Sequence, residues 1–147
     1  MSSILKSALL TILVCLAFIN VLQAQTYGQI FTKQEADELF GPVLISFPIT
    51  KPAVYSFLTR TNNYIMFKVK DNKAIVLDNK RNVLFPKATI INSSDEFHMF
   101  SVSVVNELLS LGNDDTVYIE QRSNVLSVSS GGFTMEISIL CPPFCPN

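Results

Sequence analysis

The chain has 147 residues, and 11 basic against 12 acidic side chains give it a formal net charge of −1. A surface with this balance has no bias toward nucleic acid or anionic lipid. The length is that of one domain, large enough to bury about two-thirds of the surface that the unfolded chain exposes.

Residues 1–24 have the pattern of a secretory signal peptide. Lys6 supplies the positive charge at the start, an almost wholly apolar run follows, and Ala24 is a small residue suited to cleavage. A transmembrane anchor is the alternative, but Asn20 and Gln23 interrupt the run before the ~20 apolar residues that a span needs. We expect export, to the periplasm or the outside of a bacterial cell, and no stable membrane span after cleavage.

Residues 25–42 are predicted to hold one short helix. Thr32 and Glu35 have the spacing of a capping box, and Phe31 is placed to pack against the first turn. The helix should stop at Gly41, which suits the residue after a helix. Such a helix covers an open edge of the core or docks a partner.

Residues 43–140 are predicted to be rich in antiparallel strands. Pro48 lies near the end of the first strand and suits an edge position, and Thr50 can cap the helix that follows it. The region after Ser93 suits a helix, yet part of it alternates as a strand would. The expected strands are 43–49, 64–70, 73–78, 83–85, 116–122, 125–129 and 133–140, joined by turns at Asp71-Asn72, Asn79–Asn82, Ser123-Asn124 and Gly131-Gly132.

One pattern occurs twice, in residues 54–85 and 105–137. Each copy has an amphipathic helical turn, a polar break and three strands, with an offset of 51 residues in the helices (105 − 54) and 52 in the strands (117 − 65). Two copies are too few for a solenoid. For the ambiguous region after Ser93, the repeat favours a strand to about Ser101 followed by a helix. The predicted fold class is α+β, a single domain of two tandem β-α-β-β-β units with antiparallel meanders.

The predicted core lies on one face of each strand and helix. In the last strand, Met135 and Ile137 are expected to face inward, while Glu136 and Ser138 point the other way. The residues expected to be buried are Val54, Phe57, Leu58, Ile65, Phe67, Val76, Val105, Leu108, Leu109, Val117, Ile119, Val128, Met135 and Ile137.

The order of elements resembles one domain of the DNA sliding clamps. The resemblance is topological, covers roughly residues 44–140 and involves no sequence motif. It implies a fold in which the two helices would line a DNA-encircling ring. Here the second helix has no Lys or Arg, and the first has only Lys51 and Arg60, whereas binding DNA needs many phosphate contacts. No site residue follows from the resemblance, and it implies the fold alone.

The only histidine, His98, lies two residues after Glu96. Alternate residues of a strand share a face, so these two side chains are weak candidates for a catalytic pair; a solvated strand-end pair is the alternative. The sequence implies no nucleophile or oxyanion donor beside them. We predict no metal site and no cofactor, because one histidine and two cysteines cannot supply the three or four ligands of zinc.

Cys141 and Cys145 are the two cysteines that remain after cleavage, in the tail of residues 141–147. In an exported protein such a pair predicts a structural disulfide. A redox-active pair is the alternative, but reactive cysteines sit at a helix N-terminus. Two prolines between the cysteines, and the chain end two residues later, exclude that helix here.

Three hypotheses on function follow. The preferred one is an exported, non-enzymatic module that binds an unknown protein partner or associates with itself. The alternatives are a glycan-directed enzyme with an unrecognised carboxylate site and a clamp-like nucleic-acid binder, which export and charge disfavour. Two carboxylates across a concave pocket would favour the enzyme, and a flat apolar patch the binder. The acidic residues available to an enzyme are Asp37, Glu38, Asp95, Glu96, Asp114 and Asp115.

Overall fold

A computed structural model of the chain describes residues 25–145. The predicted signal peptide lies outside these residues. In the described part, no helix is long and apolar enough to cross a membrane.

The capping box forms as predicted and starts the first helix. The Thr32 side chain accepts a hydrogen bond from the Glu35 amide, and the Glu35 carboxylate accepts one from the Thr32 amide at 2.8 Å. These bonds lower the pKa of Glu35, with the Thr32 amide as the main cause. The helix ends before Gly41, whose φ of 81° favours glycine. Thr50 stands at the start of the second helix, but its side chain makes no capping bond.

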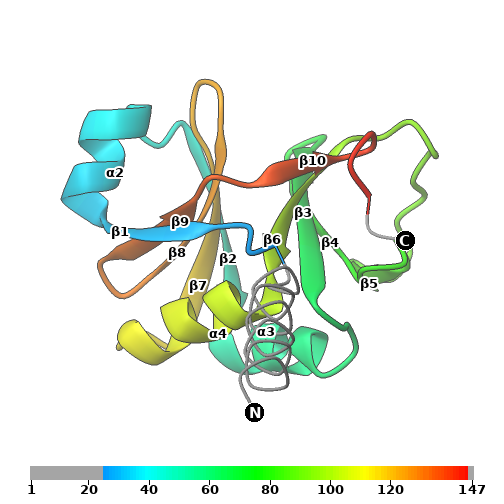
Figure 1. The fold of residues 1–147 in the computed structure, drawn as a ribbon, viewed down its shortest axis with the longest axis horizontal. Coiled ribbons are helices and arrows are strands. Elements are labelled where there is room, and N and C mark those ends of the chain that lie inside the picture. Colours follow the sequence, from blue (N-terminus) through cyan, green and yellow to red (C-terminus); the bar gives the residue numbers. More distant parts are fainter. Residues whose placement is uncertain (1–24, 146–147) are drawn as a thin grey trace, which may run out of the picture.

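The described chain is an α+β domain of three helices and two five-stranded antiparallel sheets (Figure 1). The first sheet has the order β1-β9-β8-β7-β2, and the second has β10-β6-β3-β4-β5. The elements are β1 (Gln29–Thr32), α2 (Lys33–Phe40), β2 (Ile45–Thr50), α3 (Lys51–Leu58), β3 (Tyr64–Lys70), β4 (Lys73–Leu77), β5 (Val83–Phe85), β6 (Phe97–Ser101), α4 (Val102–Leu111), β7 (Thr116–Gln121), β8 (Leu126–Ser130), β9 (Phe133–Glu136) and β10 (Ile139–Cys141).

Two of the predicted turns are tight two-residue hairpins. Asp71 and Asn72 both have positive φ, as do Gly131 and Gly132, which is the geometry that matches the twist of antiparallel strands. Gly131 also lies against the backbone of Gly112 at the end of α4, where a side chain would collide. The segment that was ambiguous in the sequence is a strand to Ser101 followed by α4, as predicted.

The order strand, helix, three strands occurs twice along the chain. The strand before each helix pairs with a strand of the other half. β2 pairs with β7, and β6 pairs with β3. Each sheet therefore combines the meander of one half with the first strand of the other half. Origin by internal duplication stays a prediction.

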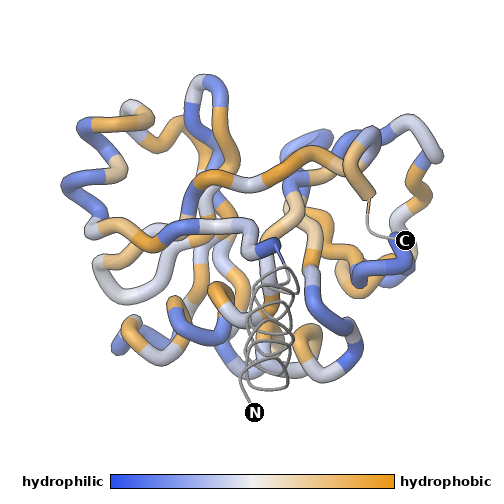
Figure 2. The backbone as a smooth tube through the Cα atoms, in the orientation of Figure 1, coloured by the Kyte–Doolittle hydropathy of each residue, from blue (hydrophilic) through white to orange (hydrophobic). Residues whose placement is uncertain are grey.

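The main core lies between the sheets and is closed by α3 and α4 (Figure 1). All the residues predicted to be buried are buried except Ile137. Hydrophilic residues gather at the turns, whereas the strands are mainly hydrophobic (Figure 2).

The prediction for the last strand is wrong at Ile137. This residue has a φ of 63° and is 52% exposed. The chain bends there, so that β9 belongs to the first sheet and β10 to the second. The alternation of apolar residues continues through the bend and therefore did not reveal it.

The second sheet also buries its outer face. Met66, Ile75 and Phe97 belong to a second apolar cluster, against which Ile91 and Cys145 pack. The cover is made by the loop before β6 and by the C-terminal tail. We call this group of residues the second cluster: Met66, Ile75, Leu77, Phe97, Met99 and Cys141.

Candidate functional site

The outer face of the first sheet carries charged residues that are nevertheless buried. The guanidinium of Arg122 and the carboxylate of Glu136 have no exposed surface, and Glu120 is 4% exposed. These side chains project opposite to the core residues of the same strands, because neighbours on a strand point to opposite faces. We call Asp37, Glu120, Arg122, Ser127 and Glu136 the arginine cluster.

Arg122 holds this cluster together and ties it to α2. Its Nε lies 2.9 Å from Ser127 Oγ and 3.1 Å from Glu136 Oε1. Its Nη1 donates to Asp37 Oδ1 at 2.7 Å and to the carbonyl of Gly41. A buried guanidinium needs such partners to offset the loss of its hydration. The cluster therefore fixes where α2 sits on the sheet.

Glu136 is the carboxyl that burial affects most clearly. Loss of hydration raises its pKa, and the hydrogen bond from Ser127 and the charge of Arg122 oppose this shift. Its Oε2 has no hydrogen-bond partner among residues 25–145. The sequence predicted Glu136 to point away from Met135, as it does. It is nevertheless buried, because α2 covers this outer face of the sheet.

A hollow of about 480 Å³ opens beside the arginine cluster. α2 contributes Lys33 and Asp37, the following loop contributes Pro42 and Val43, β2 contributes Ser46, and Asp114, Tyr118 and Glu120 complete the lining. We call this hollow the acidic pocket.

Glu120 is the most enclosed charged residue of the acidic pocket, with a side chain that is 5% exposed. Its Oε2 accepts a hydrogen bond from Ser129 Oγ at 2.5 Å and lies 4.0 Å from Arg122 Nη2. Among the described residues, no hydrogen bond reaches the other oxygen, Oε1. One acceptor of a buried carboxylate is thus available to whatever enters the pocket.

The carboxylates of the acidic pocket belong to no group of metal-ligating side chains found in residues 25–145. Metal sites of the zinc or calcium type need several ligands within reach of one point. Over residues 25–145, the structure contains no group of three or more His, Cys, Asp or Glu side chains that could hold an ion.

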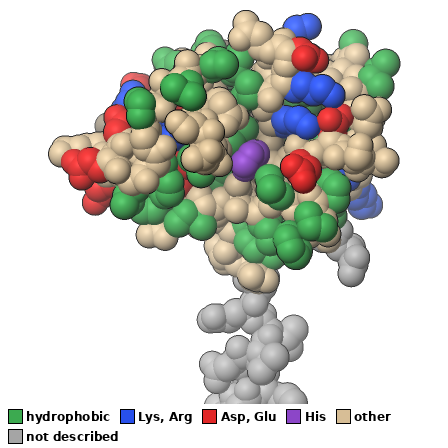
Figure 3. All heavy atoms as spheres, turned by 90° about the horizontal axis from the view of Figure 1, so that it is seen from above, with side chains coloured by type: hydrophobic (Ala, Val, Ile, Leu, Met, Phe, Trp, Pro, Cys, Tyr) green, Lys and Arg blue, Asp and Glu red, His purple; other side chains and the backbone are tan. Residues whose placement is uncertain are grey.

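Glu96 and His98, the two weak candidates, line a second hollow of about 300 Å³ between the sheets. His98 Nδ1 lies 2.7 Å from Ser138 Oγ, and burial lowers the pKa of the imidazole. Figure 3 shows His98 at the surface, with Lys and Arg side chains gathered to one side. Lys68, which lines the same hollow, and Lys70 both bind Asp95, at 3.0 and 3.2 Å.

The sequence did not predict that Ser138 would meet His98. Ser138 follows the bend at Ile137, which brings it to β6. A hydroxyl and an imidazole are two parts of a hydrolytic triad, in which a carboxylate binds the second ring nitrogen. In the described residues, Glu96 makes no hydrogen bond to His98. The contact fastens the β9–β10 bend to β6, and this arrangement lacks the group that orients a catalytic histidine.

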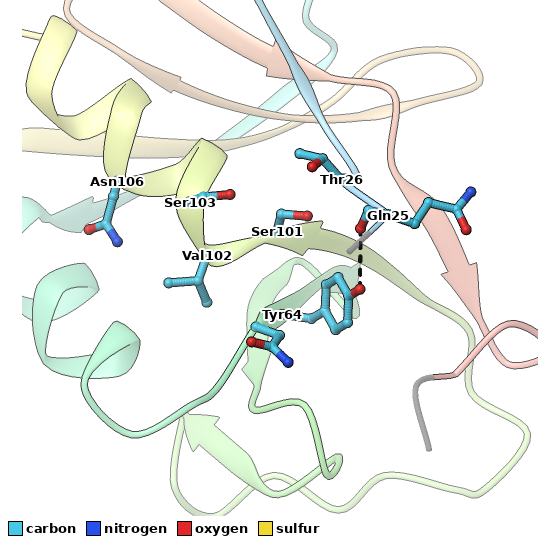
Figure 4. Close-up of a pocket in the computed structure, with 8 residues that line it drawn as sticks. Gln25, Thr26, Tyr64, Ser101, Val102, Ser103 and Asn106 are labelled. Atoms are coloured by element: carbon cyan, nitrogen blue, oxygen red, sulfur yellow. Dashed lines mark hydrogen bonds between the residues drawn. The ribbon is translucent and has the colours of Figure 1, made fainter. Parts of the chain in front are cut away.

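A third hollow, of about 370 Å³, lies at the start of α4 and is lined by neutral hydroxyl and amide groups (Figure 4). The Tyr64 hydroxyl donates to the carbonyl of Gln25 at 3.2 Å. Ser101 binds Tyr27 twice, through its own amide and its hydroxyl, each at 2.8 Å. This region anchors the beginning of the described chain and holds no charged side chain.

Cys141 and Cys145 form the predicted disulfide. Cys141 is fully buried in the second cluster, and its carbonyl accepts a hydrogen bond from Arg81 at 3.0 Å. The bond thereby holds the tail against the outer face of the second sheet.

Comparisons of the chain with protein-family models, curated proteins and solved structures found no match.

Proposed function

We propose that the domain is an exported, non-enzymatic module that binds another protein through the surface around the acidic pocket. The observation that carries the proposal is the combination of side chains there. The exposed aromatic ring of Tyr118 lines a concave surface together with the nearly buried Glu120, one of whose carboxylate oxygens accepts no hydrogen bond from the described residues, and the exposed Leu44 follows Val43 of the same lining. Aromatic anchors and enclosed polar groups at one place are typical of protein-binding surfaces.

Self-association through the sheet edges is the less favoured form of this proposal. The Lys51 amide donates to the Asp115 carbonyl at 2.8 Å. Backbone hydrogen bonds in an antiparallel pair recur at every second residue, so the odd-numbered residues of β2 are the ones that bond to β7. Pro48 therefore faces the open edge, where it offers no donor. The other edge strands, β1, β5 and β10, have four, three and three residues. Short and proline-containing edges resist pairing with a second chain.

A glycan-directed enzyme is the second candidate, because three carboxylates, those of Asp37, Asp114 and Glu120, line one pocket. Glycoside hydrolysis uses a carboxyl of raised pKa beside a free carboxylate. Asp37 is bound to Arg122, and Glu120 is bound by Ser129. The carboxyl with a raised pKa, Glu136, has no exposed surface. This arrangement favours binding over acid–base chemistry.

The third candidate, a nucleic-acid binder, is disfavoured by the chain's net charge of −1, because binding nucleic acid needs many contacts between basic side chains and phosphates.

We also propose that export follows cleavage after Ala24. The charged start, the apolar run and the small residue at position 24 support it, and a disulfide suits an oxidising compartment. The purified natural protein should begin at Gln25 in mass spectrometry, and recovery of intact Met1 in a membrane fraction would contradict export.

The binding function can be tested by photo-crosslinking in cells that produce the full-length chain. A photoreactive amino acid at Ser46 or Tyr118 samples the acidic pocket, and one at Lys80 samples the turn between β4 and β5. We expect a discrete cross-linked product from the first two positions and none from Lys80. Products of equal yield from all three positions would contradict a specific surface, and a product of twice the chain mass would establish self-association.

A further inference from the structure

We infer that the acidic pocket receives a basic side chain, arginine in preference to lysine, from the protein partner. The inference rests on the proposed binding function and adds the chemistry of what is recognised. Three features of the pocket support it independently: its charge balance, an acceptor without a partner, and the apolar character of its walls.

The charged side chains in and behind the pocket leave a net negative charge that one cation would balance. Asp37, Asp114 and Glu120 contribute three negative charges to the lining, and Lys33 contributes one positive charge. Arg122 lies behind the pocket and is the second cation nearby. The carboxylates outnumber the cations by one, and Glu136 in the same cluster adds to the negative side whenever it is ionised. A single incoming guanidinium or ammonium group balances the remaining charge.

The unpaired acceptor is Glu120 Oε1. The side chain is held in place from behind, by Ser129 and by the nearby Arg122, so its orientation does not have to be set when a ligand binds. Because the side chain is only 5% exposed, Oε1 has limited contact with water. Such a position favours a donor that carries charge, since charge-assisted hydrogen bonds are the stronger kind.

The walls suit the apolar stem of a long basic side chain. Pro42 and Val43 line one part of the pocket, and Tyr118 is 37% exposed and lines another. The methylene groups of Lys or Arg pack on apolar surfaces while the head remains in a polar environment. Arginine is favoured because its planar guanidinium stacks on an aromatic ring and presents several donors to two carboxylates at once.

The experiment is an NMR titration of the mature domain with N-acetyl-arginine amide, and with N-acetyl-citrulline amide as a neutral ligand of nearly the same shape. The arginine compound should shift the resonances of Tyr118 and Asp114 saturably. The citrulline compound should bind at least ~10-fold more weakly, because it lacks the charge. Equal binding of both compounds, or shifts that avoid the pocket, would overturn the inference.

Matched variants locate the effect. Asp114→Asn removes one charge from the lining without touching the arginine cluster, and Asp71→Asn removes the same charge at the β3–β4 turn of the other sheet. We expect Asp114→Asn to weaken arginine binding several-fold and Asp71→Asn to leave it within twofold. Equal effects of the two substitutions would show that only the net charge matters, which contradicts a specific pocket.

Failure of this inference can be separated from failure of the proposed function. If cross-linking at Ser46 persists in the Asp114→Asn variant and the arginine compound does not bind, the domain binds a partner through other chemistry. If the arginine compound binds at the pocket but no cross-linked product forms at Ser46 or Tyr118, the pocket is selective for a cation and the protein-binding function is wrong.

Discussion

The two sheets bury their inner faces in the same core but cover their outer faces with opposite chemistry. The first sheet places a guanidinium and carboxylates under α2. The second sheet places apolar side chains under a loop and a disulfide-bonded tail. The fold therefore excludes water from the outer faces of its two sheets in two different ways.

The two covers differ in how strictly they depend on geometry. An apolar side chain contributes roughly in proportion to the area it buries, whatever its neighbours are. A buried ion depends on close, well-oriented partners to offset its lost hydration, and it destabilises the fold when its partner ion is removed. The first cover should therefore be sensitive to single polar substitutions, and the second to loss of volume.

The largest effect is expected from Arg122→Met. The substitution leaves the carboxylates of Asp37 and Glu136 without their cation, and breaking a buried pair in this way commonly costs ~3–5 kcal/mol of the free energy of unfolding. Urea-induced unfolding measures this loss. The matched control is Lys68→Met, since Lys68 also pairs with a carboxylate but is 22% exposed, and a pair of that kind is worth at most ~1 kcal/mol.

The double substitution Arg122→Met with Glu136→Gln tests the reason for that loss. Removing the stranded carboxylate should restore part of the stability, because two neutral groups need less hydration than one unpaired ion. If Arg122→Met alone leaves the free energy of unfolding unchanged, the buried charges do not hold α2 on the sheet.

The second prediction concerns Phe97→Ala in the second cluster. Phe97 is fully buried, and its ring lies 5.4 Å from both Lys68 Nζ and Arg81 Cζ. Truncating a buried phenylalanine costs ~3–5 kcal/mol, and Phe67→Ala in the main core is the reference for that value. If Phe97→Ala alone lowers the free energy of unfolding by less than ~1 kcal/mol, the loop before β6 and the C-terminal tail close readily over the cavity left by the ring.

The sequence predicted the inner faces well because periodicity reports them directly. Ile65 and Phe67, like Val117 and Ile119, recur at every second position of a strand, and all four are fully buried. The capping box at Thr32 and the hairpin glycines are local signals, and both formed as predicted. Local pattern and one-sided burial are what a single sequence encodes most plainly.

The sequence did not predict the burial of the outer sheet faces or the acidic pocket, because both depend on which segments cover the sheets. Polar residues such as Glu136 alternate with the core as solvent-facing residues do, and nothing local shows that α2 lies over them. Met66 lies on the outer face of β3, beside the inward-facing Ile65 and Phe67, and is buried in the second cluster. The meeting of His98 and Ser138 required the bend at Ile137. These features are long-range consequences of the fold.

The third prediction is that the disulfide contributes modestly to the second cover. Cys141 and Cys145 are separated by 4 positions, and closing so short a loop stabilises a protein by about 2 kcal/mol at most. Replacing both with alanine should lower the free energy of unfolding by no more than that, because alanine keeps the buried position of Cys141 apolar. Thiol reagents should not label the native protein. Loss of the fold on this double replacement would show that the tail is essential to the second sheet.

The last prediction uses pH to compare buried and exposed carboxyls. Burial raises the pKa of Glu136 above its ordinary 4.5, so the folded protein keeps this proton at pH values where the unfolded chain has lost it. Its favourable contribution is complete below about pH 4.5 and is lost as the pH rises through the folded pKa. Relative to Glu136→Gln, the stability of the unmodified domain should therefore decrease from pH 4.5 upward in urea unfolding experiments.

Glu35 supplies the control of opposite sign. The Thr32 amide lowers the pKa of Glu35 below 4.5, so its contribution is present above that pH and is lost as the pH falls through the folded value. Glu35→Gln should therefore lose stability relative to the unmodified domain at neutral pH and lose little in acid. If Glu136→Gln shows the same sign as Glu35→Gln, Arg122 keeps the Glu136 carboxylate ionised despite its burial. The arginine cluster would then behave as a compensated ion pair, and the contrast between the two outer faces would be smaller than the geometry suggests.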